Sequence, residues 1–384
     1  MAPQLKTLIQ SEKTTYEERL RAIEALCVIY DEISFPEWLV FARSNRAGMR
    51  HFACSIAAHF EMKEAKEDIL RLIHDSHPDV RIAAINAFGL YYRKITDPKE
   101  TLVRLKPVLE DATPEVAITA AWAALISGLD TEEVFYKWLN DSLSEIRRFA
   151  AAAISATGER GNSLSSRMLK ESSDLYVQAN LAMGLLGQRK EVSACSDILY
   201  TFLQEEKRMW MWDTRQNPLF QVLAPSQVRH VDHIPNYPEA IDQMTRLNLL
   251  SLLALVEDPR ALVALKSFLK KKTWGITGVA AATLLQEGDE TSLEVVRQLL
   301  DDPDPDVRLQ SCFVLAMLGK DESVLHDLQG AYIAADHERK LHILEAMGRV
   351  GNVESFHFLL SAFKEPFPIL RIAAAAALIQ SIHR

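Results

Sequence analysis

The sequence predicts an all-α protein, a right-handed α-solenoid of about 11–12 two-helix repeats. Three observations lead to this fold class. Similar segments return about every 31 residues, apolar residues recur within each segment at helical spacing, and the composition favours helix. Of the 384 residues, 48% are hydrophobic but only 8% are aromatic, so the apolar content is mostly Ala and Leu, which prefer helix to sheet.

The repeat is defined by one position, usually Arg, that returns at nearly constant intervals. Its members are Arg19, Arg50, Arg81, Ala117, Arg147, Gln178, Arg246, Thr277, Arg308, Lys340 and Arg371. Eight of the ten intervals lie within one residue of 31. A fixed period of this length indicates stacked repeats, because a single helix pair cannot bury its apolar face alone.

The second helix of each repeat begins close to this position. Three residues later, seven of the eleven positions are Ala, and seven residues later every position is apolar. Offsets of three, four and seven residues lie on one face of a helix, so these columns predict the packed face.

Residues that start and stop helices flank this second helix. Prolines lie three residues before the defining position in four repeats, where a first helical turn tolerates them: Pro78, Pro114, Pro305 and Pro368. Thr113 and Asp304 precede two of them and are predicted N-caps. Glycines eleven residues after the defining position predict left-handed helix ends at Gly128, Gly158, Gly288, Gly319 and Gly351.

The first helix of each repeat is predicted from shorter amphipathic stretches. These cover residues 67–74, 100–111, 131–141, 260–269 and 291–302. Each repeat is therefore expected to contain a first helix, a short Asp/Pro turn and a second helix.

Two segments carry a family resemblance. DSHPDVRIAAINAFG (75–89) and DPDPDVRLQSCFVLAMLG (302–319) share an Asp/Pro turn, a Val-Arg pair and a helix rich in Ala or Leu. This pattern resembles the short bacterial HEAT repeat, also called the phycobilisome-lyase-like HEAT repeat, and the resemblance extends from about residue 5 to residue 382. It implies the solenoid fold, whereas repeats of this kind serve many unrelated functions.

One long interval interrupts the array. Its 68 residues predict a degenerate repeat near residue 209, with a first helix over 192–206 and a second-helix region, 207–223, that has lost the Ala column. We therefore expect an N-terminal array (1–206), a degenerate repeat with an irregular insertion (207–240) and a C-terminal array (241–384) in one continuous solenoid. Long irregular insertions often carry function, so candidate residues in this segment are Trp210, Trp212, Arg215, His230 and His233. The alternative is an expanded repeat whose Trp residues fill its own core.

Variable positions on the second helices predict a second candidate site. In α-solenoids these helices line the concave side, and aromatic and Met side chains are favoured anchors of protein interfaces. The candidates for protein binding are Phe52, Trp122, Phe149, Met183, Phe313 and Met317. The alternative is that neighbouring helices bury these side chains.

Net charge, cysteine spacing and the lack of visible sorting signals argue against nucleic-acid-binding, metal-binding, secreted and membrane proteins. The net charge of −9 opposes general nucleic-acid binding, which needs an excess of Lys and Arg. The four cysteines show no metal-binding spacing and are expected to be free thiols packed as small apolar groups. No signal peptide or membrane-length apolar run is visible, so a cytoplasmic protein is expected.

The sequence contains no recognisable catalytic motif. GxSxG, Walker-type and GxGxxG patterns are missing, and His230 with His233 lacks the further ligands that zinc requires, so neither a metal nor a cofactor is predicted. A HEAT-like enzyme family, deoxyhypusine hydroxylase, binds two irons through His-Glu pairs early in its second helices. The matching positions here are His51-Phe52, Ile82-Ala83, Leu309-Gln310 and Ile372-Ala373, so that resemblance fails at the iron ligands.

These observations predict a non-enzymatic scaffold that binds a protein or peptide on its concave face, with no membrane partner. Partner identity stays open, and so does assembly into a hetero-oligomer. The alternative function is a subunit of an enzyme complex similar to the phycobilin lyases, which share the repeat type, with 207–240 as its specific site.

Overall fold

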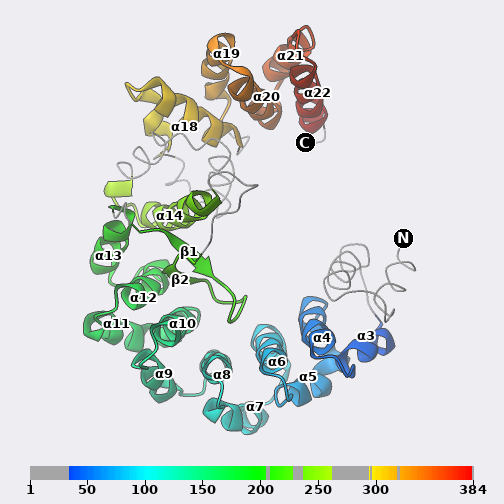
Figure 1. Ribbon diagram of the computed structural model, residues 1–384, viewed down its shortest axis with the longest axis vertical. Helices are drawn as coiled ribbons and strands as arrows, with labels where there is room; N and C mark the ends of the chain where they lie inside the picture. Colours follow the sequence, from blue (N-terminus) through cyan, green and yellow to red (C-terminus); the bar gives the residue numbers. More distant parts are fainter. Residues whose placement is uncertain are drawn as a thin grey trace. The chain divides into compact units, whose positions relative to one another are not determined.

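The computed structural model describes residues 34–204, 208–227, 237–261, 294, 296–317 and 321–382. Within these ranges the chain is built from paired helices, which confirms the predicted all-α solenoid class (Figure 1). It divides into two compact units. Unit 1 comprises Met1–Gly184 and Asp213–Leu223, and unit 2 comprises Leu185–Trp212 and Ala224–Arg384.

Unit 1 is a row of helix pairs in which the second helix of one pair packs against the second helix of the next. These second helices form the inner side of the row (Figure 1). We call them the helix-B series: α4 (Ala47–His59), α6 (Pro78–Leu90), α8 (Pro114–Ile126), α10 (Ser144–Ser155) and α12 (Leu175–Gly187), the last three residues of which belong to unit 2. The first helices are α3 (Phe35–Ala42), α5 (Lys66–Leu72), α7 (Pro98–Leu105), α9 (Glu132–Leu139) and α11 (Asn162–Glu171). Short 3-10 segments are η1 (Lys63–Ala65), η2 (Tyr92–Ile95), η3 (Lys106–Glu110) and η4 (Gly158–Gly161).

Unit 2 repeats the helix-pair plan. Its described elements are α13 (Val192–Gln204), α14 (Tyr237–Leu255), η5 (Gln298–Asp301), α18 (Pro305–Met317), η6 (Glu322–Val324), α19 (Leu325–Ala334), α20 (His337–Val350), α21 (Val353–Ala362) and α22 (Pro368–Ile382). Second helices again pack on one another, α18 on α20 and α20 on α22. A methyl group at Gly348 of α20 would overlap Ala377 of α22, so glycine permits this close approach.

The predicted packing columns are buried. The residues three positions after the defining position are fully buried wherever the structure describes them: Ala53, Ala84, Ala120, Ala150, Leu181, Leu249, Ser311, Ile343 and Ala374. The column at seven positions is buried too, from Ala57 in α4 to Leu378 in α22. The periodic pattern therefore identifies the face on which the repeats stack.

The predicted helix ends are largely confirmed. Pro78, Pro114, Pro305 and Pro368 are each the first residue of a helix. The amide of Asp306 donates to Oδ1 of Asp304 (3.0 Å), so Asp304 is an N-cap as predicted.

Thr113 differs from the expectation. It occupies the N-cap position of α8, but its side chain makes no capping bond, and its Oγ1 instead accepts from Nη2 of Arg81 (3.4 Å). The side-chain cap predicted for Thr113 was therefore wrong; the hydroxyl contacts an arginine of the preceding repeat.

The left-handed glycines predicted at helix ends are confirmed where the structure describes them. Gly128, Gly158 and Gly351 have φ of 96°, 66° and 64°, in the left-handed region that favours glycine. Gly288 and Gly319 lie outside the described residues.

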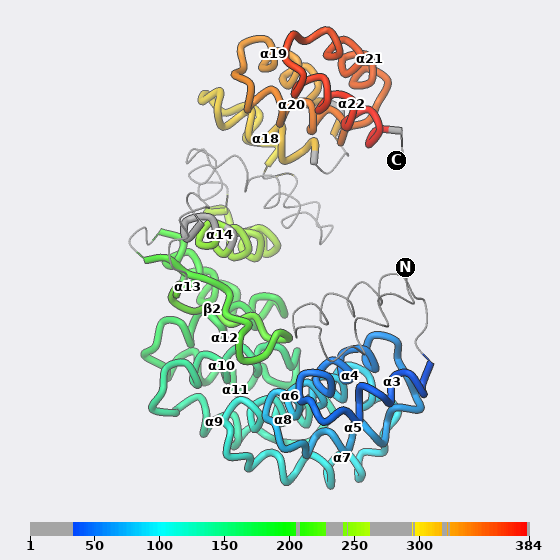
Figure 2. Tube along the Cα trace, turned by 45° about the vertical axis from the view of Figure 1, so that its right-hand side comes forward, coloured from blue at the N-terminus to red at the C-terminus, as the bar shows by residue number. Residues whose placement is uncertain are grey.

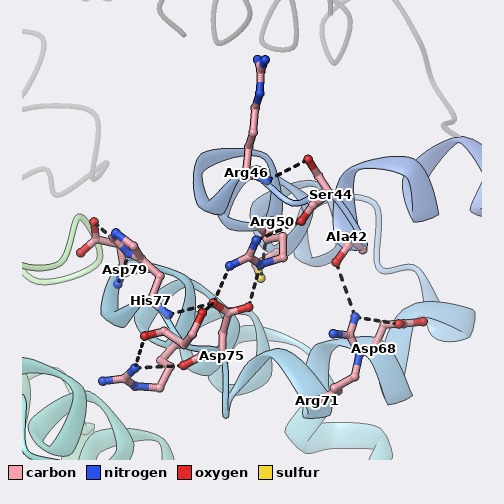
Figure 3. Close-up of polar contacts among 12 residues, drawn as sticks. Ala42, Ser44, Arg46, Arg50, Asp68, Arg71, Asp75, His77 and Asp79 are labelled. Atoms are coloured by element: carbon pink, nitrogen blue, oxygen red, sulfur yellow. Dashed lines mark hydrogen bonds and ion pairs between the residues drawn. The ribbon is translucent and has the colours of Figure 1, made fainter. Parts of the chain in front are cut away.

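The defining arginine has a structural role that the sequence pattern did not reveal (Figure 3). Arg50 donates through Nε and Nη2 to both carboxylate oxygens of Asp75, at 2.7 and 2.8 Å, and through Nη1 to the carbonyl of Ser44 (2.9 Å). Each bond joins the start of one second helix to a turn of its own or the next repeat. Hydrogen bonds from Arg50 and from the amide of His77 outweigh burial and hold the pKa of Asp75 below its ordinary value.

The same contact recurs along unit 1. Arg81 donates to the carbonyl of Asp75 (2.9 Å) and to Oδ1 of Asp111 (3.0 Å). Arg147 donates to the carbonyl of Asp141 and to the carboxylate of Asp174, both at 2.9 Å. We call this series the arginine ladder; it links successive turns, so the repeated Arg and Asp residues are explained by stacking.

The segment expected to form a degenerate second helix over 207–223 contains strands instead. β1 (Trp210–Asp213) and β2 (Val222–Pro225) pair in a two-stranded sheet. Asn217-Pro218 interrupts any helix here because a residue before proline avoids helical backbone angles. The preceding helix, predicted over 192–206, is observed as α13.

Three of the four cysteines lie in the described residues. Cys54, Cys195 and Cys312 are buried free thiols, as expected, and burial raises the pKa of Cys195 and of Cys312 to about 12. Cys27 lies outside those residues. In the part of the chain that the structure describes, no helix has both the length and the apolar character needed to cross a bilayer.

Candidate functional site

Residues Asp213–Leu223, which we call the strap, lie on the helix-B series of unit 1. Figure 2 shows the chain leading from β1 to β2 running beside α12, α10 and α6, and Figure 1 shows the same arrangement from a second direction. The strap contains a turn, closed by the amide of Phe220 donating to the carbonyl of Asn217 (3.2 Å), and then extends into β2.

Asn180 of α12 holds the main chain of the strap. Its Nδ2 donates to the carbonyl of Leu223 (2.9 Å), and its Oδ1 accepts from the amide of the same residue (2.8 Å). The second N–H of Asn180 donates to the carbonyl of Tyr176 (2.8 Å), which uses both donors of this amide. Asn180 is 1% exposed, so these bonds replace water at a buried main-chain position.

Asn217 of the strap pairs with Asn86 of α6. Each amide donates to the other, at 2.8 and 3.0 Å, and Nδ2 of Asn217 also lies 3.2 Å from Oγ1 of Thr119 on α8. Asn217 is 1% exposed, and its Oδ1 further accepts from the amide of Leu219 (2.9 Å). An asparagine therefore suits this position, because its side chain donates to Asn86 and Thr119 and accepts from Asn86 and Leu219.

Phe220 fills an aromatic pocket between the two polar contacts. Its ring centre lies 5.4 Å from that of Trp122 on α8 and 5.6 Å from that of Phe149 on α10, both in edge arrangements. Nε1 of Trp122 donates to the carbonyl of Ala156 (3.2 Å), which fixes the indole. A methyl group at Gly89 of α6 would overlap this indole, so the glycine makes room for the pocket wall.

Trp122 and Phe149 were predicted to face a partner, whereas the structure buries both. Their exposed fractions are 5% and 0%. The expectation of an open aromatic surface at these two positions is therefore corrected. The covering residue, Phe220, comes from the strap of the same chain, which the sequence analysis did not predict.

The other predicted positions on the second helices are Phe52 and Met183 in unit 1 and Phe313 and Met317 in unit 2. Phe52 and Met183 are half-buried, and the Phe52 ring lies edge-on to His51 (5.5 Å). In unit 2, Phe313 is 7% exposed, so its predicted exposure on a free surface is also corrected. The side chain of Met317 lies outside what the structure describes.

The candidates in 207–240 are used in different ways. Trp210, in unit 2, is fully buried; its ring contacts Phe202 (centroids 5.1 Å), and the guanidinium of Arg246 lies 4.2 Å from its centre. Trp212 is half-buried. Trp210 therefore fills a core, as the alternative interpretation held, and no open site at Trp210 is present.

Arg246 fixes the start of the β1 strand. It donates to Oδ2 of Asp242 (2.7 Å) and to the carbonyls of Leu203 and Arg208 (both 3.1 Å), while Oδ1 of Asp242 accepts from the amide of Trp210 (2.9 Å).

Arg215 lies at the exposed tip of the strap. Its Nε and Nη2 donate to the two carboxylate oxygens of Asp213 (2.9 and 2.7 Å), and this pairing holds the pKa of Asp213 below its ordinary value. His230 and His233 lie outside the described residues, and among those that are described no group of three or more His, Cys, Asp or Glu is arranged to hold a metal ion. The described part of this segment offers no specific observation for the lyase-type alternative.

A cavity of about 330 Å³ lies beside the strap tip. Its lining includes Arg215 and Gln216 of the strap, His51 of α4, His77 at the N-cap position of α6, and Asp79 of α6. Burial lowers the pKa of His51, so this imidazole is neutral at pH 7. Among the described residues, the strap thus covers the helix-B series from α6 to α12, and the cavity lies where the strap tip meets α4 and α6.

Sequence reasoning missed the three asparagines that carry the polar contacts. Asn86 and Asn180 occupy outward-facing positions on the second helices, where only aromatic and Met side chains were taken as binding candidates. A signal was nevertheless present, since both stand in helices that are otherwise mostly apolar. A buried amide there requires a partner.

Comparisons with known proteins agree with the helix-pair architecture. Residues 35–126 and 293–379 match the family described as HEAT repeats, one matching segment in each unit. The match does not distinguish the short bacterial subtype, which stays a prediction. No curated protein matches the chain.

Several solved structures are similar at low identity. Kap121p bound to Pho4p is 13% identical with a TM-score of 0.39, and the match covers 98% of this chain and 45% of Kap121p. This chain therefore spans less than half the length of Kap121p. An engineered protein (14% identity, TM-score 0.29, covering 100% and 99%) and human deoxyhypusine hydroxylase in complex with glycerol (15%, 0.27, covering 100% and 96%) are also similar.

Proposed function

We propose that this protein is a non-enzymatic interaction scaffold that binds a protein or peptide segment on the helix-B series of unit 1. One observation carries the proposal. On that surface, the side chain of Asn180 forms two hydrogen bonds with the main chain of Leu223, in the extended part of the strap.

This contact matches what segment recognition requires. Main-chain hydrogen bonds give affinity for an extended chain, while pockets for individual side chains give selectivity. Here the amide of Asn180 supplies the first, and the pocket of Trp122 and Phe149 supplies the second. Aromatic side chains in well-packed pockets are also the usual anchors of protein interfaces.

The open part of the surface extends the same face toward α4. There Ser55 is exposed and Phe52 is half-buried. His51, which precedes Phe52 in α4, lines the cavity at the strap tip. A partner segment lying on the helix-B series therefore passes over α4, whereas the first helices lie on the other side of the row (Figure 1).

The test compares one bulky charged substitution on each side of unit 1. Ser55→Arg places a long side chain on the open part of the face, and Val103→Arg places it on α7, where Val103 is 69% exposed. Both sites are at the surface, so neither substitution should unfold the protein. Partners recovered by affinity purification and quantified by mass spectrometry should be lost with Ser55→Arg and kept with Val103→Arg. Equal recovery with both variants would contradict the proposal.

A further inference from the structure

We infer that the strap is a built-in occupant of a binding site, and that the external partner of this site is a segment of the form Asn-Pro-x-Phe-x-x-Leu that displaces it. This inference rests on the proposed function, since it specifies the partner and regulation of the same surface.

The contacts of the strap define the positions that the site reads. Asn217, Phe220, Val222 and Leu223 are at most 3% exposed, whereas Pro218 and Gln221 are exposed. Three of the buried positions have defined partners on the helix-B series: the Asn217 amide pairs with Asn86, the Phe220 ring contacts Trp122 and Phe149, and the Leu223 main chain pairs with Asn180. Pro218 after Asn217 favours the turn that presents the amide.

Nothing in these contacts depends on the strap being part of the same chain. Asn86 and Asn217 are separated by 131 positions, Thr119 and Asn217 by 98, and Asn180 and Leu223 by 43. They meet through side-chain hydrogen bonds, one main-chain pair and ring contacts. A separate segment with the same residues can make every one of them.

The strap also leaves space beside its tip. The cavity of about 330 Å³ is lined by Arg215 and Gln216 of the strap together with His51 and His77. A competing segment can enter here before it replaces the more deeply buried Phe220.

Tethering makes the strap a strong competitor. A segment held by a short linker has an effective concentration on the order of millimolar, so an external segment binds only the fraction of molecules whose strap has left. This gives three separate expectations. Weakening the strap alone tightens external binding. Weakening a face contact that strap and partner share has little effect in the intact chain, because both lose the same contact. Weakening that face contact once the strap is released weakens external binding.

The experiment uses a fluorescent peptide of residues 213–225 and the full chain, with binding followed by anisotropy. The released chain carries Asn217→Ala and Phe220→Ala, and Gln221→Ala, at an exposed strap position, is its control. We expect the peptide to bind the released chain at least about tenfold more tightly than wild type or the control, because the tethered competitor has lost its side-chain contacts to Asn86, Trp122 and Phe149. Adding Asn180→Ala to the released chain should weaken binding at least about tenfold. Adding Asn140→Ala should not: Asn140 makes the same bond to the carbonyl four residues before it but is exposed.

Two results would overturn the inference. One is a released chain, folded by circular dichroism, that binds no peptide up to about 1 mM, the effective concentration of a short tether. The other is binding that Asn180→Ala does not change, or that a peptide with Ala in place of the Asn and Phe reproduces. A negative result here leaves the proposed function standing, because the comparison of Ser55→Arg with Val103→Arg concerns the part of the face that the strap does not cover.

Wild type provides a second measurement in case the released chain does not fold. An excess of isotopically labelled peptide should accelerate hydrogen exchange at the Leu223 amide of the intact chain, as the strap leaves Asn180. Unchanged exchange at about 1 mM peptide would show that the strap is a fixed part of unit 1 and would contradict displacement.

Discussion

At the scale of single residues, the arginine ladder and the strap contacts stabilise the fold in different ways. Arg50 and Asp75 have side chains 13% and 8% exposed and form a two-pronged ion pair. Arg71, which bonds Asp68 (3.0 Å), is 53% exposed (Figure 3). Removing Arg50 leaves the buried Asp75 carboxylate without the arginine that pairs with both of its oxygens. Asp68 is also only 12% exposed, but it keeps a second arginine, Arg43 (3.4 Å), when the more exposed Arg71 is removed.

We therefore expect Arg50→Ala to lower the free energy of unfolding by about 3 kcal/mol and Arg71→Ala by less than about 1 kcal/mol. Urea denaturation of the three proteins measures both values. Equal losses would show that the ladder acts as an ordinary surface pair.

The same pair has a defined pH dependence. The pKa of Asp75 lies below its ordinary value in the folded protein. Its contribution is therefore present above the unfolded pKa of about 3.9, and is lost as the pH falls through the lower folded value. The difference in stability between wild type and Arg50→Ala should be constant from pH 7 to about pH 5 and shrink below about pH 4. A difference that grows on acidification would contradict this assignment.

The buried thiols give a third prediction at this scale. Burial raises the pKa of Cys195 and Cys312 to about 12 and raises that of Cys54 further, so little thiolate forms at pH 8. Iodoacetamide at pH 8 should leave these three cysteines unmodified in the native protein and modify them in urea, as read by peptide mapping. Native labelling of Cys54 at the rate seen in urea would refute the burial.

At the scale of elements, the helices could be predicted from the sequence and the strap could not. The Ala column from Ala53 to Ala374 is buried because its spacing encodes one helix face locally, whatever lies beyond. The strap depends on contacts across 43 to 131 positions, for which a single sequence holds no periodic signal. Trp122 and Phe149 illustrate the consequence: the sequence predicted that they are exposed, whereas Phe220, far along the chain, covers both.

The strap predicts a difference between two asparagines on neighbouring elements. Asn180 and Asn140 each donate to the carbonyl four residues before them at 2.8 Å, but only Asn180 also pairs with the main chain of Leu223. Asn180→Ala leaves a buried N–H and a buried C=O without partners, so it should lower the free energy of unfolding by about 2–4 kcal/mol. Asn140→Ala, at an exposed site, should cost less than about 1 kcal/mol. Equal losses in thermal or urea denaturation would mean that the Leu223 contact does not stabilise the fold.

At the scale of the whole molecule, the chain is built from two compact units, and the division between them runs through the β1–β2 hairpin. The strap belongs to unit 1 although the sequence on either side of it belongs to unit 2. A 31-residue repeat predicts neither this division nor the return of the chain to an earlier part of the array, because repeats specify contacts with neighbours only.

The central claim is that the helix-B series of unit 1 binds an extended main chain through hydrogen bonds. The hydrogen-exchange rate of the Leu223 amide tests this claim most directly. Residue-level exchange should show this amide strongly protected in wild type and in Asn140→Ala, and clearly faster in Asn180→Ala, because its acceptor is Oδ1 of Asn180. Exchange in wild type as fast as in an unfolded chain, or protection that Asn180→Ala leaves unchanged, would contradict the account.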